Sequence, residues 1–329
     1  MKLGLYFDLR DPPPWQRGWV SVYAQALETA EQADARGIGS FWLSEHHFFE
    51  DGYLPQPLVF AAALAARTKR ARIGTAVLIA PLRSALEIAE EAAVADVISG
   101  GRLELGLGSG YRVPEFDAFG AFPDRRFADL EDRGRNVQEL LAGGCVTPRP
   151  SQDPLPIWIG GHKNRAGRIA GKLGAGLLSL NPAAWTVYCD ALEEAGHDRQ
   201  IARAAGPLTL VLADDPERAW AEIEPHAVYG WRTYDEYARE GREGMARPPT
   251  LPGVFDAIEG GAKPPVQVVT VDEAIAQLHA IDASATVEHV FFWERVAGMP
   301  DDIAARHVEL IVDQLVPAVA EFDRVESHI

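Results

Sequence analysis

Residues 40–47 read SFWLSEHH, residues 72–80 read RIGTAVLIA, and residues 102–112 read RLELGLGSGYR. Each segment holds a short apolar run, and two longer stretches with helical patterns separate them. Continuous apolar strands that alternate with helices are typical of a parallel sheet covered on both faces. These three segments therefore predict consecutive β/α units.

The same alternation continues in both directions along the chain. We predict eight strands, at residues 3–7, 40–43, 72–80, 102–107, 156–159, 176–180, 208–212 and 287–293. Helices are predicted at residues 23–36, 57–68, 86–98, 127–141, 164–173 and 185–195, from residue 216, and at 303–322. Eight β-then-α units predict an α/β fold, a (β/α)8 TIM barrel, and an open doubly wound sheet is the alternative. A barrel of this type needs roughly 250 residues, so the chain is expected to form a single domain, 1–329.

An insertion follows the seventh predicted strand. Residues 230–265 are rich in glycine and proline among aromatic residues, and they break the β/α rhythm. Loops that follow barrel strands gather at one end of the barrel. Two interpretations of the segment stay open, a lid over that end and a tolerated surface insertion.

Composition excludes several classes of protein. Of the 329 residues, 47% are hydrophobic and 24% are charged, and the net charge is -17, which disfavours nucleic-acid binding. Cys145 and Cys189 form no disulfide framework and no zinc spacing. Because no run of about 18 apolar residues occurs and the apolar N-terminal run is too short for a signal peptide, we expect no membrane span and a cytoplasmic location.

Glu45, His46 and His47 follow the second predicted strand. Catalytic groups in barrels lie at the carboxyl ends of strands, and imidazoles there can donate or accept protons. Neighbouring residues of an extended chain point to opposite sides, so we expect one histidine to face the pocket. Two structural histidines are the alternative. A metal site is disfavoured because adjacent residues seldom chelate one ion and no HExxH motif occurs.

The fourth predicted strand continues into Gly108, Ser109, Gly110 and Tyr111. Glycines at alternate positions let a ligand approach the backbone, and the tyrosine can flank a planar ring. A proline at position 114 follows instead of an immediate helix, so a dinucleotide-binding fingerprint is poorly supported.

The fifth predicted strand ends in Gly160, Gly161, His162 and Lys163, and a helix follows. Glycine N–H groups, a helix N-terminus and a lysine charge together suit a phosphate. An ordinary strand–helix turn is the alternative.

Aromatic residues stand at several predicted strand ends. Phe7, Phe49 and Trp293 are candidates to line an apolar substrate pocket, although aromatic residues also fill barrel cores.

Residues 41–120 and 156–180 resemble the bacterial-luciferase-like, flavin-dependent oxidoreductases, whereas the last third of the chain shares only its final strand and its ending. The resemblance implies a TIM barrel and a reduced flavin that reacts with dioxygen. It implies that His46 is the active-site histidine that supports the flavin–oxygen intermediate. It also implies that Ala76 and Val77 form a bulge behind the flavin ring, often through a cis peptide bond.

The resemblance further implies that residues 160–163 cradle the flavin phosphate. Gly108 stands where luciferase has a cysteine, and Ser109 stands where luciferase has a phosphate-binding arginine. Phosphate recognition is therefore expected to use Ser109, backbone N–H groups and Lys163 or Arg165. Light emission is not implied.

We accordingly predict a monooxygenase that uses reduced FMN, delivered by a separate flavin reductase, to oxidise a small organic substrate. The resemblance suggests a homodimer. Three alternatives stay open: hydride transfer with the deazaflavin coenzyme F420, a non-catalytic flavin-binding protein, and a metal-assisted hydrolase using Glu45 and His47.

Overall fold

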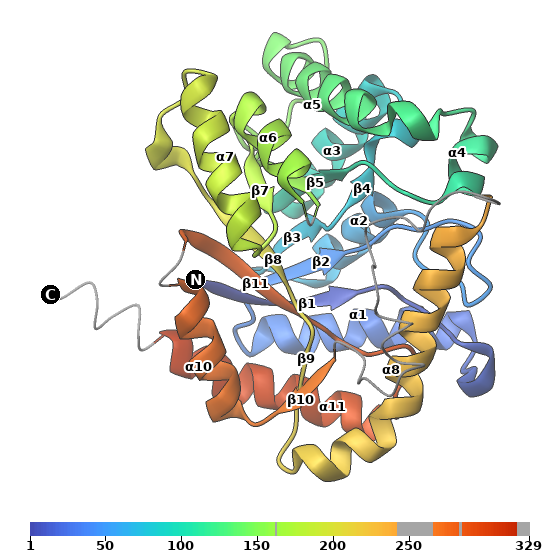
Figure 1. Cartoon of the computed structure of the whole chain (residues 1–329). Coiled ribbons are helices and arrows are strands. Elements are labelled where there is room, and N and C mark those ends of the chain that lie inside the picture. The colour runs from blue at the N-terminus through green and yellow to red at the C-terminus, as the bar shows by residue number, and fades with distance from the viewer. Residues whose placement is uncertain (162, 242–265, 283–284, 321–329) are drawn as a thin grey trace, which may run out of the picture.

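The computed structural model is a closed parallel barrel covered by helices (Figure 1). It describes residues 1–161, 163–241, 266–282 and 285–320. The strand order is β3-β2-β1-β11-β8-β7-β6-β5-β4, and a further pairing of β3 with β5 closes the sheet. Every pair is parallel, so the predicted (β/α)8 TIM barrel is confirmed.

The barrel strands are β1 (Lys2–Phe7), β2 (Ser40–Leu43), β3 (Arg72–Thr75), β4 (Leu78–Ile79), β5 (Leu103–Gly108), β6 (Ile157–Gly160), β7 (Gly176–Leu178), β8 (Ala204–Leu208) and β11 (Val287–Trp293). A separate parallel pair is formed by β9 (Leu210–Leu212) and β10 (Gln267–Val269). The helices are α1 (Trp19–Ala35), α2 (Pro57–Arg67), α3 (Ala85–Ser99), α4 (Val113–Phe119), α5 (Arg126–Gly143), α6 (Asn164–Leu173), α7 (Pro182–Glu194), α8 (Pro216–Arg239), α10 (Val271–Asp282) and α11 (Asp301–Leu310), the last continuing into a π-helical turn (Ile311–Leu315).

Alternation along β1 divides its side chains between two cores. Leu5 and Phe7 pack outward in the layer between the sheet and the helices. Tyr6 points inward and packs with Trp42 and Phe291 in the barrel interior. The prediction that Phe7 lines the substrate pocket is therefore wrong, because its side chain lies on the helix side of the sheet.

The third predicted strand is interrupted in its middle. The Ala76–Val77 peptide bond is cis and separates β3 from β4, which confirms the predicted bulge. The Val77 side chain lies against Gly108 and Gly160 of the next two barrel strands: a Cβ on Gly108 would lie 2.1 Å from Val77 Cγ2, and one on Gly160 would lie 2.3 Å from Val77 Cγ1. These two glycines therefore make room for the Ala76–Val77 bulge itself.

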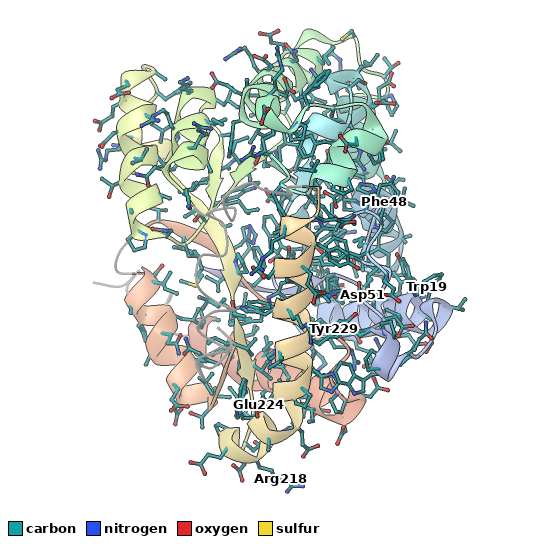
Figure 2. The ribbon with its side chains drawn as sticks, turned by 45° about the vertical axis from the view of Figure 1, so that its right-hand side comes forward. Trp19, Phe48, Asp51, Arg218, Glu224 and Tyr229 are labelled. Carbon is teal, nitrogen blue, oxygen red and sulfur yellow. The ribbon has the colours of Figure 1, made fainter. Side chains whose placement is uncertain are left out.

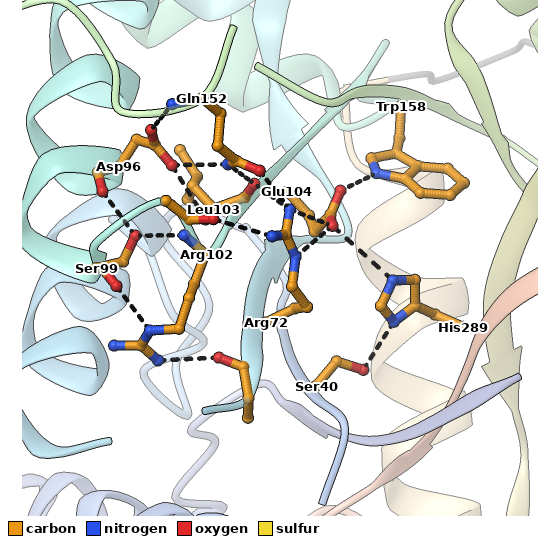
Figure 3. A network of polar contacts seen from close by, with 12 residues as sticks. Ser40, Arg72, Asp96, Ser99, Arg102, Leu103, Glu104, Gln152, Trp158 and His289 are labelled. Atoms are coloured by element: carbon orange, nitrogen blue, oxygen red, sulfur yellow. Dashed lines mark hydrogen bonds and ion pairs between the residues drawn. The ribbon is translucent and has the colours of Figure 1, made fainter. Parts of the chain in front are cut away.

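A buried polar network occupies the amino ends of the strands, opposite the loops predicted to be functional (Figure 3). The Glu104 carboxylate accepts hydrogen bonds from Arg72 Nε at 2.6 Å and from Trp158 Nε1 at 2.8 Å. His289 Nδ1 lies 3.2 Å from the Ser40 hydroxyl, and burial lowers the pKa of His289 to about 3. These groups stabilise the end of the barrel at which the strands begin.

The structure differs from the prediction around the mouth of the barrel. The loop predicted after Tyr111 contains α4, and the first ten residues of the predicted insertion 230–265 belong to α8, which continues to Arg239. Residues 242–265 lie outside the described part of the chain. No described helix combines the length and the apolar character that a membrane span requires.

The packing of the bulge gives a stability prediction. Gly108→Ala forces a methyl group into Val77, and overpacking of this kind costs typically about 1–3 kcal/mol of unfolding free energy. Val77→Ala should recover much of that loss in the double variant, as measured by urea unfolding. Gly143→Ala is the control, because a Cβ there meets no atom within 4 Å. If the losses of unfolding free energy in Gly108→Ala and Val77→Ala simply add in the double variant, this account of the bulge is contradicted.

Candidate active site at the carboxyl end of the barrel

The candidate residues converge on one end of the barrel. Because all barrel strands are parallel, the segments after β2, β3, β5 and β6 all leave from the same rim. Among these mostly buried segments, residues 76, 77, 109–111, 160 and 161 are half-exposed. They form an open face on which a ligand can lie.

His46 is held on both edges of its ring. Its Nδ1 lies 3.0 Å from Glu115 Oε1, and its Nε2 lies 3.3 Å from the Tyr111 hydroxyl. The ring stacks on Phe49 with centroids 4.7 Å apart and planes 17° apart. The His46 side chain is 10% exposed and Glu115 is fully buried. The orientation of this imidazole is therefore fixed.

The hydrogen bonds also assign the protons. Glu115 Oε1 accepts the backbone N–H of His47 at 2.9 Å, so the carboxylate acts as an acceptor. Burial raises the pKa of Tyr111, so its hydroxyl stays protonated and donates to His46 Nε2. His46 Nδ1–H then donates to Glu115. A carboxylate behind an imidazole stabilises the imidazolium form and supports proton transfer at the other nitrogen.

Glu45 and His47 belong to a separate buried pair. Glu45 Oε1 accepts from His47 Nε2 at 2.8 Å and from Arg83 Nη1 at 2.5 Å, and Glu45 Oε2 accepts the Ile79 backbone N–H at 2.6 Å. The contacts with Arg83 and Ile79 tie the end of β2 to the segment around β4. The geometry thus gives the two neighbouring histidines different surroundings, as the alternation argument predicts.

Helix α8 lies across the mouth and contacts the loop that carries Phe48 and Asp51 (Figure 2). The Tyr237 ring packs on Phe49 with centroids 4.0 Å apart. Arg112 donates to the His47 carbonyl and pairs with Glu240, which follows α8, and its guanidinium lies 4.7 Å from the Tyr237 ring centre. This helix therefore forms one wall of the site.

A second buried cluster lies at the end of β1. Arg10 Nε donates to Asp51 Oδ2 at 2.6 Å, and Arg10 Nη2 donates to Thr233 Oγ1 at 2.5 Å. Tyr229 of α8 faces the loop that carries Asp51, with its hydroxyl 3.4 Å from Asp51 Oδ2 (Figure 2). The ion pair thus joins the end of β1 to the loop after β2, and the hydrogen bonds of Thr233 and Tyr229 join both to α8.

Asp8 is the titratable group of this cluster. Its Oδ1 accepts the Arg10 backbone N–H at 3.1 Å. Burial raises the pKa of Asp8 to about 7, although the nearby Arg10 charge opposes the shift. Asp8 is thus an acid that can carry a proton near neutral pH.

The donors for a phosphate lie around the start of α6. This helix has Lys163 at its N-cap without any side-chain hydrogen bond to its first N–H groups, and its first turn holds no acidic residue. Gly161 has a φ of 155°, and Gly110 has a φ of 63°. The Ser109 hydroxyl donates to the Gly110 carbonyl at 3.2 Å, and the Arg165 guanidinium lies 4.5 Å from the Phe127 ring centre. His162 lies outside the described residues.

These residues fit a flavin. An uncapped helix start beside half-exposed glycines is a donor set for a phosphate. The half-exposed Ala76–Val77 bulge offers an apolar surface for a flat ring, and its position is fixed because Tyr6 donates to the Ala76 carbonyl at 2.5 Å. For a metal ion, the described residues provide no cluster of three or more suitable side chains.

Sequence reasoning missed several residues of the site. Glu115 lies outside every predicted helix, yet the structure places it in the first turn of α4, where Pro114 is a helix-start signal. Asp8 could have been found from alternation on β1, because it shares the inward face with Tyr6. Tyr234 and Tyr237 fell in a segment predicted to be irregular.

Comparison with known proteins places this geometry in a family. Residues 1–291 match the model of the family described as luciferase-like monooxygenase. The chain belongs to this family. It is 26% identical to limonene 1,2-monooxygenase of Rhodococcus erythropolis, over 92% of this chain and 84% of that protein. It is 31% identical to the F420-dependent glucose-6-phosphate dehydrogenase of Amycolatopsis mediterranei, over 50% of this chain and 56% of that enzyme.

A solved structure supports the fold. The crystal structure of a monooxygenase from Streptomyces bottropensis aligns with a TM-score of 0.76 and 24% identity, over 97% of this chain and all of that one. As a luciferase-like protein the chain is an oxidoreductase, and its relatives include both monooxygenases and F420-dependent enzymes.

Asp8 gives this luciferase-like protein a pH-dependent stability. Between about pH 4 and pH 7 the unfolded chain releases the Asp8 proton while the folded protein keeps it, so the contribution of Asp8 to the unfolding free energy falls as pH rises. Asp8→Asn lacks the titrating carboxyl group. The unfolding free energy of this variant relative to the wild type should therefore rise between about pH 4 and pH 7. Urea unfolding of both proteins at several pH values measures the difference.

Two buried histidines change the unfolding free energy with pH in the opposite direction. Their contribution is the same in the wild type and in Asp8→Asn, so it cancels in the difference. The pKa of His289 is lowered to about 3 and that of His307 to about 4, so their stabilising contribution is lost as pH falls below about 6.5. Both proteins contain them. A difference between wild type and Asp8→Asn that stays constant with pH would refute the assignment.

Proposed function

We propose that this protein is a monooxygenase that uses reduced FMN and dioxygen to oxidise a small organic molecule. One observation carries the proposal: His46 is fixed between Glu115 and Tyr111 at the rim, one strand from the open Ala76–Val77 bulge. The two strand ends are joined directly, because the Ala76 N–H donates to the Leu43 carbonyl at 2.6 Å. When bound, reduced FMN supplies the two electrons that activate dioxygen.

The residues of the chain then have distinct roles. Ala76 and Val77 support the flavin ring, and Tyr6 fixes their backbone. His46 holds or donates a proton at Nε2, while Glu115 keeps Nδ1 protonated and stabilises the charged imidazole. Aromatic side chains around His46 exclude water from the reacting atoms.

Backbone amides hold the phosphate in this proposal. Gly110, Gly161 and the first N–H groups of α6 supply donors, and Lys163 and Arg165 add positive charge. Ser109 adds a hydroxyl from the neighbouring loop. Glu45 and His47 position the end of β2 and so act through His46.

A second candidate cofactor is the deazaflavin coenzyme F420. The relative from Amycolatopsis mediterranei is F420-dependent by name, and an imidazole paired with a carboxylate also suits proton transfer that accompanies hydride transfer. We favour FMN because it can activate dioxygen, and the relative that aligns over 92% of the chain is a monooxygenase by name, whereas the F420-dependent dehydrogenase aligns over 50%. Monooxygenase activity with free reduced FMN requires a separate flavin reductase as partner.

We further propose a homodimer formed through α2 and α3. These neighbouring helices expose an apolar surface, which we call the α2–α3 face. It consists of Val59, Leu86, Val94, Val97 and Ile98, which are 43–70% exposed. Contiguous exposed apolar surfaces of this kind mark protein–protein interfaces.

The flavin proposal is tested by binding and reoxidation. Wild-type protein should bind reduced FMN more tightly than reduced F420 in anaerobic fluorescence titrations. His46→Ala should keep FMN affinity within about threefold but change the rate of flavin reoxidation by oxygen about 100-fold or more, the usual scale of acid–base catalysis. Tyr111→Phe is the matched variant that keeps the ring and removes only the hydroxyl. Unchanged reoxidation and product yield in His46→Ala would refute the role of His46, and tighter binding of F420 would favour the alternative cofactor.

The dimer proposal has a closely matched control. Ile98→Glu places a charge in the α2–α3 face and should convert the dimer to a monomer in light scattering. Ile201→Glu should not, because Ile201 is equally exposed, 46% against 47%, but follows α7 on another side of the barrel. A wild-type monomer, or a dimer that survives Ile98→Glu, would rule out this interface.

A further inference from the structure

A narrow cavity lies between the end of β1, the end of β11 and helix α8. Its wall is mostly aromatic and aliphatic, and it contains two charged residues at the end of β1. The lining consists of Asp8, Arg10, Thr209, Gly230, Trp231, Tyr234, Val266, Trp293, Val296 and Ala297. Trp293, predicted as a pocket residue, is one of them.

The cavity adjoins the candidate flavin site on two sides. The Tyr234 ring, which lines the cavity, lies 6.1 Å from the His46 ring. The Trp293 ring lies 4.4 Å from the Tyr6 ring, and Tyr6 contacts the Ala76 carbonyl. Tyr234 therefore separates the cavity from His46, and Trp293 and Tyr6 separate it from the bulge.

The charge of Arg10 is already compensated. Its guanidinium pairs with Asp51, donates to Thr233, and lies over the Tyr53 and Tyr234 rings at 5.6 and 5.4 Å. It thereby occupies the position over these aromatic rings that a cationic ligand would take. A second cation in the cavity would be repelled by Arg10.

Two hydrogen-bond donors face the cavity. Trp231 Nε1 is buried and has no hydrogen-bond partner among the residues that the structure describes, and an indole N–H can only donate. The Asp8 carboxyl lines the same space, and in its protonated form it donates through its hydroxyl. Two donors in an apolar cavity are complementary to an acceptor without a charge, such as a carbonyl oxygen.

We propose that Asp8 is the specificity-determining residue of a substrate cavity, and that this cavity takes a small, uncharged, largely apolar molecule that carries one carbonyl oxygen. The inference rests on the proposed function for its link to the reaction, because it places that molecule beside the flavin site. The Asp8 carboxylic acid and the Trp231 indole N–H donate to the carbonyl oxygen, and the aromatic walls contact the remainder.

The cavity must widen when such a ligand binds. Its free space is about 10 Å³, enough for the centre of about one water molecule. Asp8 and Trp293 lie at barrel strand ends, whereas Trp231 and Tyr234 lie on α8. Widening therefore requires α8 to move away from the strand ends, against the Arg10–Thr233 and Tyr229–Asp51 hydrogen bonds.

Proton occupancy of Asp8 makes this recognition depend on pH. Burial raises the pKa of Asp8 to about 7, and above that value its carboxylate repels a carbonyl oxygen. The titratable and charged groups of the described residues that surround Asp8 or its cavity are Tyr6, Arg10, Arg17, Asp51, Tyr53, His226, Tyr234, Glu294 and Arg295. Substitution of Asp8 itself separates its titration from theirs.

The test uses the full-length, flavin-free protein and cyclohexanone, with binding followed by ligand-observed NMR. Cyclohexanone should bind at about pH 6 and about tenfold more weakly at about pH 8, on either side of the Asp8 pKa. Cyclohexylammonium and cyclohexanecarboxylate are the charged comparison probes, and both should bind more weakly than cyclohexanone at pH 6.

Three variants separate the contributions. Asp8→Asn keeps a donor that does not titrate, so it should bind cyclohexanone equally at both pH values. Asp8→Leu should bind about tenfold more weakly at pH 6, and Trp231→Phe should lose a similar factor while it keeps the pH dependence.

The proposal is overturned if cyclohexylammonium binds better than cyclohexanone, if Asp8→Asn keeps the pH dependence, or if Asp8→Leu binds like the wild type. Failure of the proposed function is recognised separately, because FMN binding and reoxidation are measured without the ketone. A protein that binds FMN but shows one of these results keeps its proposed function and loses this specificity.

Discussion

The site depends on one constraint, the alternation of side chains along parallel strands that close into a barrel. Closure brings eight strand ends to a single rim, and alternation decides which side chains reach the interior there. On β1 this rule sends Phe7 to the helices and Tyr6 to the interior. A shift of one residue along a strand would therefore exchange the side chains that face the barrel interior with those that face the helices.

The Ala76–Val77 bulge shows how closely the rim is packed. Val77 reaches the backbone of two neighbouring strands, and only glycine at positions 108 and 160 leaves room for it. From the sequence alone these glycines suggested contact with a ligand. The structure shows that their first role is to admit the bulge, and the bulge then supplies the open surface.

The sequence predicted the features that depend on local patterns, and it missed those that depend on contacts between distant segments of the chain. The eight strands were predictable because buried parallel strands are continuous apolar runs. His46 and the bulge were predictable from motifs that resemble a family. Glu115 was not, because its partner His46 lies 69 residues away and no local pattern signals that contact. The tyrosines of α8 were missed because glycine and proline nearby indicated a loop, whereas the helix is stabilised by its contacts across the mouth.

Two acidic side chains at this rim have different chemical roles because their surroundings differ. Glu115 accepts hydrogen bonds from the His46 ring and from the His47 N–H. Asp8 lies in an aromatic setting, and burial favours its protonated form. One carboxyl group therefore stabilises positive charge on an imidazole while the other can donate a hydrogen bond near neutral pH. Asp8 lines the cavity beside α8, whereas Glu115 is buried on α4 behind the His46 ring. The same functional group therefore serves as a hydrogen-bond donor at one place on the rim and as the acceptor that orients the imidazole at another.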